Sequence, residues 1–203
     1  MVPTLQRTLG VKGHRLCVGT RDNKNLLYVF GALNVVTGQL HTRTLESRTS
    51  DRRRTGQSKT ARLQQAFAQQ IGDLARAYPA QQFPRVVLII DNAPWHRGAQ
   101  LNAVLAQHRH IELKRLPSYS PSLNVIERLW KKLRQGVTHN VLFETLSHLK
   151  AALRREIGRL QSWSQHMTRM IGDCYSKKWA NRRQGRWYCT LHPDPFRTIS
   201  PGV

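Results

Sequence analysis

One uninterrupted apolar stretch constrains the fold more than any other part of the chain. Residues Val86 to Ile90 read VVLII and run directly into an acid, Asp91. Five consecutive apolar residues are typical of a strand that is buried on both faces of a sheet. The residue that follows such a strand lies at the exposed carboxyl edge of the sheet. The pattern therefore predicts a layered α/β fold with the Asp91 side chain at one edge.

The segments around this strand predict a mixed sheet. A helix and a second strand, residues 111–116, follow it, and strand, helix and strand of these lengths form a right-handed crossover with parallel strands. Three short segments rich in strand-forming residues precede it, at 15–20, 26–33 and 39–45. Because polar turns separate these three segments, we expect an antiparallel meander.

Other segments have the spacing of amphipathic helices, with apolar residues three and four positions apart. They cover residues 60–78, where Ser58 is a candidate cap, the segment that begins near Glu127, and residues 142–160. The predicted class is α/β, with an antiparallel meander and parallel crossover strands in one sheet flanked by helices.

The charge balance indicates the kind of partner. The chain has 33 Lys and Arg against 11 Asp and Glu, a formal net charge of +22, and a field of this sign attracts polyanions, so nucleic acid is the expected partner. Solubility alone does not need so one-sided an excess. Three scattered cysteines do not make a disulfide framework or a paired zinc site. The lack of a membrane-length apolar run or a signal peptide predicts a soluble cytoplasmic protein.

Asp91 and Glu127 are the candidate metal ligands. One ends a strand and the other opens a helix, on elements that we expect to be neighbours. Carboxylates bind Mg²⁺ or Mn²⁺, and two such ions about 3.5–4 Å apart can hold the attacking and leaving oxygens of a phosphodiester displacement. Each acid also has a purely structural interpretation: Asp91 as a turn residue before Pro94, and Glu127 as the return half of a capping box with Asn124.

Four further residues are candidates for contact with nucleic acid. His96 could orient a water molecule or a phosphate, or be an exposed loop histidine satisfied by solvent. Lys131, Lys132 and Arg134 follow Glu127 on the same helix and could hold phosphates, although such a run is usually a solvated face. Trp130, on the same helix, is expected to pack in the core.

Two motifs carry a family resemblance. The first, IIDNAPWH, contains Asp91, Asn92 and His96. The second, LPSYSPSLNVIERLW, contains Pro117, Tyr119, Ser120, Pro121, Leu123, Asn124, Ile126, Glu127 and Trp130. Both resemble the DDE endonuclease domain of mariner-type bacterial insertion-sequence transposases, and LLYVFGALNVVTGQL is similar to the second and third strands of that family. The resemblance covers roughly residues 2 to 160.

The resemblance implies an RNase H-like fold in which Asp, Asp and Glu hold two Mg²⁺ ions, with water or a 3′-hydroxyl cutting and rejoining DNA at transposon ends. Asp91 matches the second family carboxylate and Glu127 the third. No residue matches the first, because Asp22 lies in a turn after the first recognisable strand. Val125 stands where the family usually has proline, and the family's N-terminal helix-turn-helix region is not matched.

We therefore expect residues 1–160 to form a DDE transposase catalytic domain, truncated at its N-terminus, followed by a basic, aromatic-containing tail at 161–203. Aromatic residues in that tail could stack on bases, although a poorly ordered extension fits its lack of periodicity better. Little strand transfer is expected from this chain alone. Besides DNA, the open partners are a second copy of the chain and an upstream polypeptide that supplies the first Asp.

Two other functions remain open at this point. The first is a noncatalytic basic DNA-binding remnant of a truncated transposase gene, which shares the charge argument and needs no metal. The second is an RNase H-like nuclease that acts on RNA hybrids, for which the sequence carries no specific motif.

Overall fold

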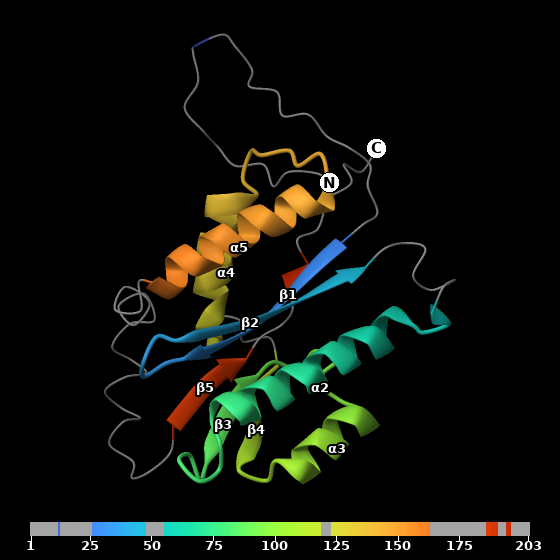
Figure 1. The fold of residues 1–203 in the computed structure, drawn as a ribbon, viewed down its shortest axis with the longest axis vertical. Coiled ribbons are helices and arrows are strands. Elements are labelled where there is room, and N and C mark those ends of the chain that lie inside the picture. Colours follow the sequence, from blue (N-terminus) through green and yellow to red (C-terminus); the bar gives the residue numbers. More distant parts are fainter. Residues whose placement is uncertain are drawn as a thin grey trace.

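The structure, a computed structural model, describes residue 12, residues 26–47, 55–118 and 123–162, and the backbone of two strands at 186–190 and 194–195. The described strands form one mixed sheet in the order β2-β1-β5-β3-β4, with β6 paired to β1. Helices α4 and α5 cover one face of this sheet, and α2 covers the other (Figure 1). The elements are β1 (Leu26–Asn34), β2 (Leu40–Ser47), α2 (Lys59–Ala77), β3 (Val86–Ile90), α3 (Ala99–Gln107), β4 (Ile111–Arg115), α4 (Ile126–Val137), α5 (Leu146–Ser162), β5 (Arg186–Thr190) and β6 (Asp194–Pro195).

Strands β1 and β2 form the antiparallel hairpin that the sequence predicts. Their register pairs Leu26 with Ser47 and Leu33 with Leu40. The turn depends on Asn34, whose side-chain oxygen accepts hydrogen bonds from the backbone N–H groups of Val36 and Thr37 at 2.9 and 3.1 Å. This part of the meander is confirmed, whereas the predicted strand at 15–20 and Asp22 lie outside the described residues.

Strand β1 divides the core into two layers because its side chains alternate between the faces of the sheet. Leu27, Val29 and Leu33 pack with α4 and α5. Tyr28 and Phe30 are buried on the opposite side, against α2, α3 and β3. Burial on both faces makes β1 a central strand, and packing on its side chains positions α4 and α5 on one face of the sheet and α2 on the other.

Helix α2 begins where the sequence predicts. Ser58 is its N-cap, and the Ser58 hydroxyl accepts a hydrogen bond from the Ala61 N–H at 3.1 Å. The helix then buries an apolar stripe that includes Leu63, Phe67 and Ile71. It ends at Ala77, before Pro79, because proline cannot continue the hydrogen-bonding pattern.

The crossover unit is also confirmed. Strand β3 covers the predicted residues, and it pairs in parallel with β4, with Val86 opposite Ile111 and Ile90 opposite Arg115. Helix α3 joins the two strands and buries Leu101. Since parallel neighbours end at the same edge, the residues after β3 and after β4 lie together.

Helices α4 and α5 form the other cover of the sheet. Trp130 is buried, as expected. Helix α5 begins at Leu146, later than the predicted start at 142, because the Thr145 hydroxyl accepts a hydrogen bond from the His148 N–H at 3.2 Å and begins the helix there. A Cβ at Gly136 would lie 2.7 Å from an oxygen of Glu156, so glycine lets the two helices approach closely.

Strand β5 is the main difference from the expected layout. Its backbone lies in the middle of the sheet, antiparallel to β1 (Leu33 opposite Cys189) and parallel to β3 (Leu88 opposite Tyr188). From the sequence we expected a basic, aromatic-containing tail at 161–203 and identified no strand in it. The tail lacks apolar periodicity, so a strand supplied by pairing with β1 and β3 was not visible in it. The described β1–β2 hairpin joins the β3–β4 unit through this strand.

No described helix combines the length and the apolar character needed to cross a membrane.

Candidate functional site

Asp91 lies at the carboxyl end of β3, where the apolar run ends. Its side chain is 25% exposed. The carboxylate oxygen Oδ1 accepts a hydrogen bond from the Ala93 N–H at 3.0 Å, which closes a tight turn. The turn role predicted for Asp91 is therefore present, and it leaves the carboxylate accessible to solvent at the sheet edge. Turn formation and ligand binding are compatible here because a carboxylate accepts several bonds.

The loop after Asp91 is tied to the end of β4. The Asn92 side chain donates to the Leu116 carbonyl at 2.8 Å, and the Arg115 guanidinium donates to the His96 carbonyl at 2.6 Å. The Leu116 N–H donates to the Ile90 carbonyl at 2.8 Å and extends the pairing of the two strands. These bonds hold residues 91–96 as one ordered turn beside the sheet edge.

His96 is completely buried, which contradicts the alternative of an exposed loop histidine satisfied by solvent. Its imidazole lies against the Phe67 ring of α2, with ring centroids 4.3 Å apart. The Nδ1 atom faces Asp91, 3.0 Å from Oδ1 and 3.2 Å from the backbone carbonyl. The exposed alternative was wrong because the loop packs against Phe67 of α2, a contact that the loop sequence alone does not reveal.

Glu127 lies in the first turn of α4 and is half-buried. The helix has Val125 as its N-cap, without a side-chain cap hydrogen bond, and the Glu127 N–H donates to the Asn124 carbonyl at 3.1 Å. A carboxylate in the first turn is favoured by the helix dipole. The position of α4 depends on Gly31 of β1, where a Cβ would lie 3.0 Å from the Trp130 ring.

Asp91 directly follows β3, and Glu127 lies in the first turn of α4, one of the helices that cover the sheet. Ile89 of β3 packs with the cluster beneath α4 and α5, whereas Leu88 and Ile90 pack on the α2 side. Asp91 follows the last residue of the strand, and its Oδ1 atom lies 3.0 Å from His96, whose ring packs on Phe67 of α2. In the described part of the chain, no group of three or more His, Cys, Asp and Glu side chains is arranged to hold a metal ion.

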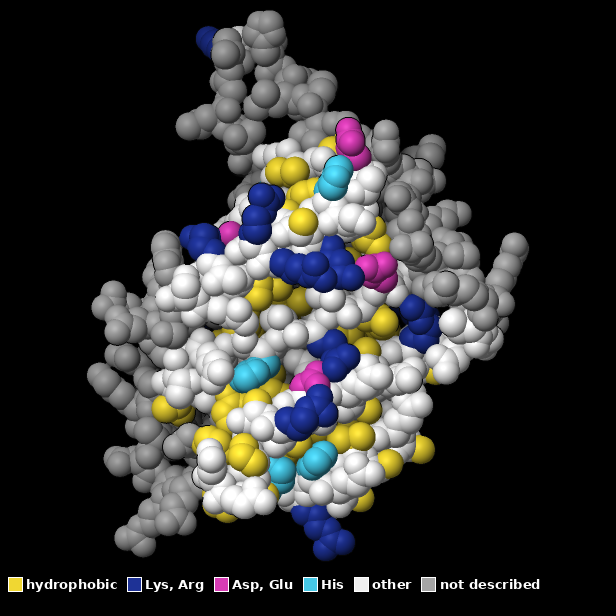
Figure 2. Space-filling model, viewed as in Figure 1, with side chains coloured by type: hydrophobic (Ala, Val, Ile, Leu, Met, Phe, Trp, Pro, Cys, Tyr) yellow, Lys and Arg dark blue, Asp and Glu magenta, His cyan; other side chains and the backbone are white. Residues whose placement is uncertain are grey.

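The basic residues after Glu127 divide into two groups. Lys131 and Arg134 follow it by four and seven positions, on one stripe of the helix. Lys132 lies further round the helix and is close enough to Glu156 of α5 to lower the pKa of that carboxyl, as a smaller contribution beside the Arg159 hydrogen bond. The structure therefore brings Lys131 and Arg134, but not Lys132, to the side of α4 that carries Glu127. Figure 2 shows further Lys and Arg side chains spread over the face formed by α5 and α2.

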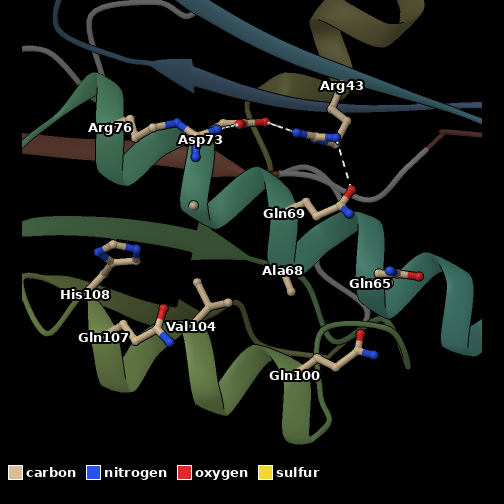
Figure 3. Close-up of a pocket in the computed structure, with 11 residues that line it drawn as sticks. Arg43, Gln65, Ala68, Gln69, Asp73, Arg76, Gln100, Val104, Gln107 and His108 are labelled. Atoms are coloured by element: carbon tan, nitrogen blue, oxygen red, sulfur yellow. Dashed lines mark hydrogen bonds and ion pairs between the residues drawn. The ribbon is translucent and has the colours of Figure 1, made fainter.

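A separate groove of about 550 Å³ lies between α2 and α3 (Figure 3). Asp73 is at one end of it, paired with Arg76 and with Arg43 of β2, whose Nε donates at 2.9 Å. Arg43 also donates to Gln69 at 3.1 Å. Neither Asp91 nor Glu127 lines this groove. The paired charges join β2 to α2 and support the α2 side of the sheet.

Two comparisons place this architecture among known proteins. The profile of the DDE superfamily endonuclease family matches residues 2–150. Among solved structures, the Mos1 Strand Transfer Complex is similar with a TM-score of 0.52 at 18% sequence identity, over 84% of this chain and 46% of that one. The Mos1 mariner paired end complex with Mn gives a TM-score of 0.50 at 18% identity, over 86% and 53% of the two chains.

The chain spans about half the length of these structural relatives. At such low identity the similarity establishes the fold. No curated protein sequence matches the chain significantly. The family profile, in contrast, covers most of the chain and includes Asp91, His96 and Glu127. This chain therefore belongs to the DDE superfamily endonucleases, as its two motifs indicated.

Proposed function

We propose that this chain is the catalytic domain of a DNA transposase, with an RNase H-like arrangement in which Asp91 and Glu127 bind divalent metal. The observation that carries the proposal is the placement of two carboxylates, one directly after β3 and one in the first turn of α4, the helix that packs over Ile89 of that strand. The family membership and the fold similarity to DNA transposition complexes support it.

The donor set fits the expected ions. Mg²⁺ and Mn²⁺ prefer hard oxygen ligands, and both residues supply carboxylate oxygens at partly exposed positions. One structural relative is described as a complex with Mn. When bound, such an ion acts as a Lewis acid and lowers the pKa of a water molecule for attack on a phosphodiester. The two side chains alone make an incomplete ligand set, so water, substrate or another carboxylate must supply the remaining positions.

The protein's own residues contribute position and charge. The turn at residues 91–96 orients the Asp91 carboxylate, and packing of α4 on β1 sets the place of Glu127. Lys131 and Arg134 then lie along the helix from Glu127, where they would hold phosphates of the DNA backbone. The net charge of +22 would raise the encounter rate with DNA.

Titration with Mn²⁺ under a thermal melt tests the metal site. At a concentration of about 100 times Kd, binding should stabilise the wild type by about 2.7 kcal/mol, which raises the Tm of a chain of this size by about 5–11 °C. Asp91→Asn and Glu127→Gln should each lose most of that shift. Glu112→Gln is the matched control, because Glu112 is an exposed carboxylate on β4 that pairs with Arg85 at 2.9 Å.

A noncatalytic DNA-binding protein is the second candidate. The strong basic charge favours it, as does the finding that no three or more His, Cys, Asp and Glu side chains of the described residues are grouped to hold a metal ion. It predicts salt-dependent DNA binding with equal Mn²⁺ shifts in the wild type, Asp91→Asn and Glu112→Gln. That result would refute the proposed metal site. A Mn²⁺ shift specific to Asp91 and Glu127, together with Mn²⁺-dependent nicking of DNA, would support the first proposal.

A further inference from the structure

The buried imidazole of His96 makes a directed contact with the candidate metal ligand. Its Nδ1 atom lies 3.0 Å from Asp91 Oδ1 and 3.2 Å from the Asp91 carbonyl oxygen. Both partners are acceptors, so Nδ1 must carry the proton and donate. The carboxylate oxygen thus receives two donors, the His96 ring and the Ala93 N–H at 3.0 Å.

The other ring nitrogen has no such contact. Among the described residues, Nε2 of His96 is buried without a hydrogen-bond partner. A buried N–H without an acceptor is costly, whereas an unprotonated ring nitrogen loses less. The environment therefore favours one tautomer, with the proton on Nδ1 and directed at Asp91.

The ring is also held in place. It packs on Phe67 of α2, and the His96 carbonyl accepts a hydrogen bond from Arg115 of β4 at 2.6 Å. The His96 N–H donates to the Ala93 carbonyl at 3.0 Å, which reverses the chain after Pro94. This turn brings the His96 ring back into contact with the Asp91 carboxylate.

We propose that His96 is a positioning residue, which fixes the orientation of the Asp91 carboxylate before metal and DNA bind. The proposal rests on the metal-binding function proposed for Asp91. Polar partners of ligating side chains reduce the reorganisation that binding requires, and their loss typically weakens metal affinity by about 10- to 100-fold. His96 would act in this way without touching metal or substrate, consistent with its complete burial.

Two substitutions distinguish the packing of the His96 ring from the hydrogen bond that its Nδ1–H group donates. His96→Phe keeps an aromatic ring against Phe67 and removes the N–H, so the Tm without metal should stay close to wild type while the Mn²⁺ Kd rises by about 10-fold or more. His96→Asn keeps an N–H donor at the place of Nδ1 and removes most of the ring. It should lower the Tm but bind Mn²⁺ more tightly than His96→Phe does.

His110→Phe is the matched control. His110 is a half-buried histidine that bonds the Tyr78 carbonyl at 2.9 Å, at the end of the sheet opposite Asp91. Its substitution should lower the Tm slightly and leave Mn²⁺ affinity unchanged. Calorimetric titration with Mn²⁺ provides the affinities, and melts without metal provide the stabilities.

The outcomes distinguish the two proposals. Normal Mn²⁺ binding by wild type together with unchanged binding by His96→Phe would overturn the positioning role alone. Weaker Mn²⁺ binding by His96→Asn than by His96→Phe would also overturn it. A purely structural role predicts that the variant with the lower Tm binds Mn²⁺ more weakly. Absence of specific Mn²⁺ binding by the wild type would overturn the metal function and the positioning role together. Long-range ¹H–¹⁵N spectra test the geometry without metal: an Nδ1–H tautomer supports it, and an Nε2–H tautomer refutes it.

Discussion

Replacing Gly31 by alanine should disturb stability and the candidate site together. An added Cβ would lie 3.0 Å from Trp130 Cη2, 3.2 Å from Cζ2 and 3.4 Å from Ile126 Cδ1. Carbon atoms in good contact are about 3.5–4.0 Å apart. Both neighbours are side chains in the first turns of α4, so these side chains must give by a few tenths of an ångström. We expect the N-terminal end of the helix, and Glu127 with it, to shift away from β1.

The size of the effect follows from two opposing contributions. Overpacking of a core costs about 1–3 kcal/mol, while replacing glycine stabilises by about 0.4–1 kcal/mol through the unfolded state. The expected net loss for Gly31→Ala is about 1–2 kcal/mol, equivalent to a fall in Tm of about 2–8 °C. Because Glu127 shifts, Mn²⁺ stabilisation should also fall relative to wild type.

Thermal melts with and without Mn²⁺ measure both effects. Gly158→Ala in α5 is the control, because no atom lies within 4 Å of its added Cβ, and it should gain up to about 1 kcal/mol of helix stability. Trp130→Phe removes the ring atoms that the Gly31 Cβ would meet. In a double-mutant cycle, the cost of Gly31→Ala should therefore be smaller on the Trp130→Phe background. A Gly31→Ala chain as stable as wild type, or strict additivity in that cycle, would refute the reasoning.

Three shorter predictions concern the other parts of the molecule. The Arg159 hydrogen bond lowers the pKa of Glu156 below 4.5, so its stabilisation is present above that pH and is lost as the pH falls through the lowered value; Glu156→Gln should make the acid side of a Tm–pH profile shallower, and an unchanged profile would count against the contact. A chain that ends at Ser162 lacks β5, so by circular dichroism it should melt without a cooperative transition or at a much lower Tm than the full chain. If the truncated chain melts as sharply as the full chain and at the same Tm, β5 is dispensable. On DNA, Lys131→Ala should reduce the slope of log affinity against log salt by about 0.9, with a smaller change for Lys132→Ala, and equal slopes for the two variants would contradict a contact confined to the Glu127 stripe.

Local patterns in the sequence predicted much of the fold. The Val86–Ile90 strand, the Ser58 cap and the burial of Trp130 each depend on a short segment and on the period of its apolar residues, and the structure agrees with all three. The crossover was predictable because a parallel pair needs a connection of that length.

The parts that were not predicted depend on distant partners. His96 is buried because Phe67, on a helix earlier in the chain, covers the loop. Strand β5 contains strand-forming residues, among them Tyr188 and Thr190, but its place in the sheet is set by pairing with β1 and β3. Neither contact has a local signal. The metal-ligand roles of Asp91 and Glu127 remain predictions for the Mn²⁺ titration.

The central position of β5 has a consequence for the order in which the protein folds. The β1–β2 hairpin and the β3–β4 unit close short loops, whereas β5 pairs residues near position 30 with residues near position 190. Non-local pairing of this kind is slow because the loop-closure entropy comes before the contacts. During synthesis, β1 and β3 would therefore present unpaired edges until residues 186–190 emerge, and unpaired edges promote aggregation. Expression should depend on how quickly the last part of the chain reaches the sheet.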